Sequence, residues 1–172
     1  MRGVTALVSP TDGELRWASG GLGRVLVARM GPGVELLRGL TELVEREGLR
    51  YAVILGGAAS LRQVRLRNVR VTPETWPIRD THRVFVDLPG PLELLSISGN
   101  VSRRPDGSIH LHAHVVVSTG GQQPGLAYGG HLVEGAVVLS TAEIAVAEIT
   151  GIALSRRMDG ETRTLELFPE RA

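Results

Sequence analysis

One segment, residues 32–48 (PGVELLRGLTELVEREG), is the only long stretch whose apolar residues recur at helical spacing. Its apolar face consists of Leu36, Leu37, Leu40, Leu43 and Val44. Gly48 follows the last charged residues, at a position where helix ends favour glycine. Nearly everything after it alternates apolar and polar residues or runs continuously apolar, as strands do. One helix beside many consecutive strands predicts an α+β domain, a mostly antiparallel sheet packed with one main helix.

Seven segments carry these strand patterns. They are residues 23–30, 51–57, 61–71, 82–102, 108–118, 131–151 and 161–168. Pro89-Gly90-Pro91 is expected to break 82–102 into two strands, and Ser140-Thr141 to divide 131–151. A change of phase near Asn68 indicates a bulge, and Pro105-Asp106-Gly107 a hairpin turn. We expect a flexible lead-in over residues 1–22, a single domain over 23–168 and a tail over 169–172.

Composition narrows the classes of function. The chain of 172 residues is the size of one domain, and without cysteine it has neither disulfides nor thiolate metal ligands. A net charge of +1 provides no overall attraction to a phosphate backbone, and 3% aromatic residues argue against base stacking. No apolar run approaches the ~20 residues that cross a bilayer, so we expect a cytoplasmic protein with no membrane partner.

Four of the five histidines gather in two nearby segments. His110, His112 and His114 alternate with apolar residues in SIHLHAHVVVS, so in a strand they share one face. Two imidazoles at this spacing can reach one metal ion, whereas three in a row cannot easily do so. His131 opens the next strand after Gly129-Gly130, which would let the backbone approach closely, and it is the natural third ligand.

This pattern predicts a three-histidine divalent metal site of the zinc type, with a position open for water. The same geometry suits a site that only stabilises the fold. The alternative is a polar strand face whose histidines are solvated or hydrogen-bonded and have no chemical role.

The ordered set of GVELLRGLTELVEREGLRYAVILGGAASLRQVRL, GPLELLSISGNVS, IHLHAHVVVS and YGGHLVEGAVVLSTAEIAVAEI resembles the plants and prokaryotes conserved (PPC) domain, which is also found in plant AT-hook nuclear proteins. The resemblance covers about residues 22–150. It implies an antiparallel sheet flanked by one main helix, a homotrimer, and a bound metal in some prokaryotic members. On that pattern His110, His112 and His131 match the metal-binding positions, and His114 is the alternate ligand.

The resemblance also implies a DNA-associated or regulatory module, yet no Arg-Gly-Arg-Pro hook is present. SRRPDG lacks the intervening glycine and is expected to be a solvated hairpin turn. Arg65 and Arg67 in RLRNVR share a face, and in a trimer they could form a basic surface for phosphates. An exposed sheet face that blocks edge pairing is the favoured explanation of that row.

Two rival functions remain at this point. In a metalloenzyme, the ion at His110, His112 and His131 would activate water near a carboxylate such as Glu143. In a small-molecule sensor, a cleft between subunits would bind the ligand. No G-x-S-x-G elbow, H-E-x-x-H helix or recognisable acid pair supports a hydrolase.

Overall fold

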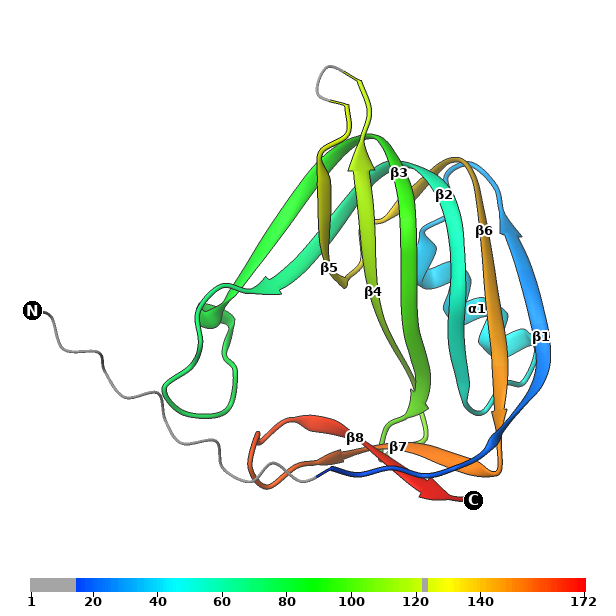
Figure 1. The fold of residues 1–172 in the computed structure, drawn as a ribbon, viewed down its shortest axis with the longest axis vertical. Helices are drawn as coiled ribbons and strands as arrows, with labels where there is room; N and C mark the ends of the chain where they lie inside the picture. Colours follow the sequence, from blue (N-terminus) through cyan, green and yellow to red (C-terminus); the bar gives the residue numbers. More distant parts are fainter. Residues whose placement is uncertain (1–14, 122–123) are drawn as a thin grey trace, which may run out of the picture.

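A computed structural model describes residues 15–121 and 124–172, so residues 1–14 of the predicted lead-in lie outside the described residues. The elements are β1 (Gly21–Met30), α1 (Leu36–Arg46), β2 (Ala52–Val69), the 3₁₀ turn η1 (Asp80–His82), β3 (Arg83–Arg103), β4 (Ile109–Thr119), β5 (Ala127–Leu132), β6 (Val137–Thr150), β7 (Ile152–Met158) and β8 (Leu165–Arg171). The predicted α+β architecture is confirmed: one α-helix accompanies a sheet that is antiparallel except where β3 meets β7 (Figure 1).

The strands form one sheet in the order β1-β6-β2-β5-β4-β3-β7-β8. Because β2 also pairs with β3 along most of its length, the strands β2, β5, β4 and β3 form a closed circuit. The short strand β5 is thereby fixed on both sides, by β2 and by β4.

Helix α1 begins where the side chain of Glu35 accepts a hydrogen bond from the Arg38 N–H at 2.7 Å. It ends before Gly48, whose positive φ of 64° is a conformation that glycine adopts without strain. Its buried residues Leu36, Leu40 and Val44 join one apolar core with residues of β2, β3, β4 and β6. The helix therefore covers one face of the sheet and leaves the other face to polar and apolar side chains that point away from this core.

The two predicted strand breaks are wrong. β3 continues through Pro89-Gly90-Pro91, because its register with β2 shifts between Leu61 and Gln63 and absorbs the irregularity. A Cβ on Gly90 would lie 2.5 Å from the Leu61 carbonyl oxygen, so glycine is what allows β3 to stay this close. β6 also continues through Ser140, whose N–H donates to the Ser60 hydroxyl at 3.2 Å.

The predicted bulge near Asn68 is also wrong, since the register shifts of β2 lie earlier in the strand. At the C-terminal end, β7 and β8 form a hairpin that crosses the ends of the long strands (Figure 1). β8 extends to Arg171 and so includes most of the predicted tail. No helix among the described residues is long and apolar enough to span a membrane.

Replacing Leu40 by alanine tests the helix-to-sheet contact. Leu40 is 1% exposed, and the cavity left behind is expected to lower the free energy of unfolding by about 2–4 kcal/mol. Leu165→Ala removes the same group from a residue that is 39% exposed and should cost under about 1 kcal/mol. Urea unfolding followed by circular dichroism measures both; equal losses would show that α1 contributes little to the core.

Candidate metal centre

The pairing of β4 with β5 positions the histidines. His114 lies directly opposite His131, and Val115 lies opposite Gly130. Ala113, Val115 and Val117 point into the core and are almost fully buried, so the intervening histidines project from the opposite face of β4. The apolar alternation that anchors β4 is therefore what aims the imidazoles away from α1.

His112, His114 and His131 come together: each offers a ring nitrogen, and the three nitrogens lie within 4.8 Å of one another. Their ring centroids are 4.9–5.2 Å apart. His110 lies outside this group, with its ring 6.2 Å from that of His112. The reason is the register, because His131 is opposite His114 and His110 lies four residues further along β4. The structure thus places the alternate ligand, His114, beside His112 and His131. The ligand set His110, His112 and His131 stays a prediction.

Arg156 of β7 holds the ring of His112 in place through a hydrogen bond to Nδ1. This arginine is only 5% exposed, and its guanidinium donates to Nδ1 of His112 at 3.2 Å, to the Ser102 hydroxyl at 3.1 Å and to Oδ1 of Asn100 at 3.4 Å. A guanidinium can only donate, so Nδ1 of His112 is the acceptor and the proton of the neutral ring is on Nε2. That proton can be shared with Nε2 of His114, which lies 3.2 Å away.

The environment favours the neutral form of His110, His112 and His131. Burial, followed by the charge of Arg67, lowers the pKa of His131 to about 3. Burial, followed by the charge of Arg156, lowers the pKa of His110 to about 4 and also lowers the pKa of His112. Neutral imidazole is the form that binds a metal ion, so the lone pairs are available at neutral pH.

The cluster fits a divalent metal of the zinc type. It offers three ring nitrogens and no fourth protein ligand among the described residues, the arrangement of an open site. One contact opposes it: coordination through Nε2 of His112 would place the ring proton on Nδ1, where it would face the donor of Arg156. Metal binding at this nitrogen therefore has to break that contact.

Two glycines near the cluster occupy positions where a side chain would collide with a neighbouring strand or its side chains. A Cβ on Gly99 of β3 would lie 2.1 Å from the His112 carbonyl oxygen. A Cβ on Gly130 would lie 2.4 Å from Oδ1 of Asn68, whose amide donates to the Gly129 carbonyl at 2.9 Å. Asn68 of β2 thus ties down the residues that precede His131; the group close to Gly130 is this side chain, and the predicted close approach of the backbone stays a prediction.

A hollow of about 390 Å³ adjoins His114 on the side of β3. Its lining is Ser96, Ser98, His114, Val115, Val116, Gly129 and Gly130. Ser98 is opposite His114 in the register, so its side chain lies on the histidine face. The small side chains leave room beside the cluster for a small molecule with hydroxyl groups at one wall.

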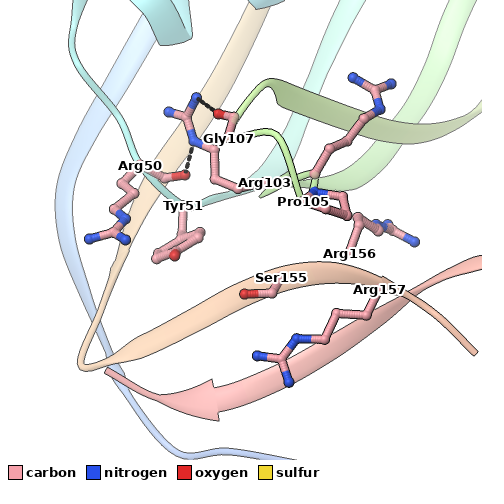
Figure 2. A pocket seen from close by; sticks show the side chains of 9 residues that line it. Arg50, Tyr51, Arg103, Pro105, Gly107, Ser155, Arg156 and Arg157 are labelled. Atoms are coloured by element: carbon pink, nitrogen blue, oxygen red, sulfur yellow. Dashed lines mark hydrogen bonds between the residues drawn. The ribbon is translucent and has the colours of Figure 1, made fainter.

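A larger cavity of about 700 Å³ lies between the end of α1, the β3–β4 turn and β7 (Figure 2). Its lining contains Arg50, Arg103, Arg104, Arg156 and Arg157. Most of these guanidiniums are already engaged: Arg103 donates to the carbonyls of Leu49 and Arg50, and Arg157 pairs with Glu170. The positive cavity is therefore mainly a structural junction that holds the hairpin and the turn together.

Sequence reasoning missed Arg156 and its partners, because nothing in the pattern LSRRM distinguishes a buried arginine from an exposed one. The expected carboxylate is not at the cluster: Glu143 pairs with Ala58, about 30 Å along β2 from Arg67 and His131 at about 3.3 Å per residue. Glu166 of β8 is the carboxylate whose charge reaches His112 and Arg156.

The fold and the cluster define a sheet-rich α+β domain with a three-imidazole face. Residues 18–150 match the model of the Plants and Prokaryotes Conserved (PCC) domain, the family called PPC above. The chain belongs to this family. The hairpin β7–β8, which supplies Arg156, lies beyond the matched residues.

Similar proteins include a bifunctional protein GlmU from Synechococcus, 32% identical over 148 residues, which are 86% of this chain and 21% of the relative. The chain thus spans about a fifth of the length of the curated relatives it matches. A metal-containing protein from Archaeoglobus fulgidus is 27% identical with a TM-score of 0.72, over 90% of this chain and 99% of that one. A PPC protein from Pyrococcus horikoshii is 30% identical with a TM-score of 0.70, over 88% and 96%.

Gly99→Ala tests whether the close contact of β3 with β4 supports the cluster. The new Cβ would overlap the His112 carbonyl, so we expect the free energy of unfolding to fall by about 2–4 kcal/mol as the strands separate. Gly31→Ala, whose Cβ meets nothing within 4 Å, is the matched control and should stay within about 1 kcal/mol of wild type. Chemical denaturation measures both, and a neutral Gly99→Ala would contradict the inferred contact.

Proposed function

We propose that the protein is a metal-binding module of the PCC family that holds one divalent ion, of the zinc type, at His112, His114 and His131, and that assembles as a homotrimer. The observation that carries the metal proposal is the convergence of three ring nitrogens within 4.8 Å. The lowered pKa of the half-buried His112 and His131 adds support, because an ion need not displace protons from them at neutral pH. The metal-containing relative from Archaeoglobus fulgidus supports the same assignment.

Two alanine variants decide between the possible ligand sets. We expect wild-type protein purified without a histidine tag to contain about one divalent ion per chain by elemental analysis. His114→Ala should lower the affinity for Zn²⁺ at least tenfold, because its ring nitrogen belongs to the cluster. His110→Ala should change it less, since the His110 ring stands apart. His82→Ala, in η1, is the control, and a larger loss in His110→Ala would favour the family-implied set.

Self-association is supported by apolar side chains on the face that α1 leaves open. Leu95 of β3 is 58% exposed, Leu55 of β2 51%, Val27 of β1 75% and Val116 of β4 39%. Val116 lies two residues from His114, so this apolar surface continues to the histidine face. Several exposed aliphatic residues on one face of a sheet are typical of a surface that another subunit covers.

Leu95→Glu is expected to convert the trimer to monomers, because burying a carboxylate in an apolar interface is unfavourable. Size-exclusion chromatography with light scattering gives the mass of each species, against a chain mass of 18.4 kDa. Val71→Glu changes a residue that is 48% exposed and lies between β2 and η1, outside this surface, and should leave the mass unchanged. A wild-type mass of one chain would exclude the trimer.

DNA association stays a prediction of the family resemblance. The row of arginines in β2 gives DNA binding little support, because Arg65 already interacts within the chain. Its guanidinium lies over the Phe85 ring and 3.4 Å from the Asp87 carboxylate. An enzymatic role for the metal has less support still, since Glu143 is remote from the cluster.

A further inference from the structure

Arg67 is the unusual residue of the histidine face. It lies directly opposite His131 in the pairing of β2 with β5, so both side chains project on the same side of the sheet. It is partly buried, and burial is the largest cause that lowers its pKa. Within residues 15–121 and 124–172, no hydrogen bond or ion pair of its guanidinium is found; the nearby Asp80 is paired with Arg83 at 2.8 Å.

A partly buried guanidinium without a partner is costly, and such groups are normally paired. Asp80 offsets part of this cost, whereas Arg83 and the other nearby guanidiniums add to it. Arg156 lies behind His112, and Arg104 acts on His110, while Glu166 is the carboxylate whose charge reaches His112. With a divalent ion present, the face would carry still more positive charge.

We propose that Arg67 and the open position beside the three histidines together bind a small anionic molecule through a carboxylate or phosphate oxygen. This inference rests on the proposed metal site. The hollow of about 390 Å³ lies on the other side of His114 from Arg67, so it gives room for the part of the molecule that extends away from the guanidinium, and the hydroxyls of Ser96 and Ser98 at its wall can donate to that part. The planar guanidinium matches the geometry of either oxyanion.

The charge expected of the ligand follows from the total charge of the groups that form the site. Imidazole ligands carry no negative charge, so the charge of a divalent ion held by the three histidines is uncompensated, and Arg67 adds a further positive charge. A neutral ligand would leave both charges unbalanced in a partly buried place, whereas an oxyanion balances them and gives Arg67 the acceptor it lacks.

The test uses full-length protein loaded with Co²⁺, whose visible absorption reports on its ligands. Cobalt content is measured first, and sodium acetate and inorganic phosphate are then titrated separately at constant ionic strength set by perchlorate. We expect a saturable spectral change with at least one probe; the acetate and phosphate arms show which oxyanion is preferred. Arg67→Met should raise the apparent Kd at least tenfold while cobalt content stays at the wild-type level, and Arg67→Lys should fall between the two.

Arg65→Met is the matched control. It removes the same charge from the same face of β2, two residues away, but from a side chain already close to Asp87 and exposed over 47% of its surface. It should change the apparent Kd less than twofold.

The outcomes separate the two proposals. Absence of cobalt in the wild type overturns the metal site and this inference with it. Cobalt bound without a response to either probe, or equal effects of Arg65→Met and Arg67→Met, overturns the anion site alone. If Arg67→Met instead dissociates the trimer and anions have no effect, Arg67 pairs with a second copy of the chain, which also overturns it.

Discussion

The antiparallel register of β2, β5 and β4 is the constraint on which the site depends. It places Arg67 opposite His131 and His131 opposite His114, so three side chains from three strands form one row across the sheet. The row is fixed by the other face of the same strands, where Leu66, Leu132 and Val115 are almost completely buried. A slip of one residue would exchange the two faces and bury the polar groups in the core, so core packing and site geometry are specified together.

The cluster is shaped by positive charge as much as by its imidazoles. Arg156 holds His112 in a tautomer whose proton is on Nε2, and Arg67 lies beside His131. Both arginines favour neutral histidines, yet both also repel a cation, and the contact of Arg156 has to break before His112 can coordinate through Nε2. The arginines that lower the pKa values of these histidines also add positive charge beside them. The site therefore favours a negatively charged ligand.

Much of the architecture follows from periodicity alone. Helix α1 and the shared face of His110, His112 and His114 were predictable because one repeat of 3.6 and one of two are clear in the sequence. The continuity of β3 through Gly90 was not, since it depends on a register shift in a neighbouring strand. That His114, and not His110, lies beside His131 could not be predicted, because it depends on the register of β4 with β5. The burial of Arg156 could not be predicted either, because it depends on where the β7–β8 hairpin packs against strands distant in sequence.

The hairpin β7–β8 lies beyond residues 18–150, which match the family, and yet it places Arg156 against a ring of the cluster. The imidazoles and the guanidinium that contacts one of them thus come from different parts of the sheet: the strands β4 and β5 carry the histidines, and the hairpin adds positive charge beside them. Exchanging this one guanidinium would therefore change both the charge beside the cluster and the freedom of the His112 ring, while the strand pairing that positions His114 and His131 stays as it is.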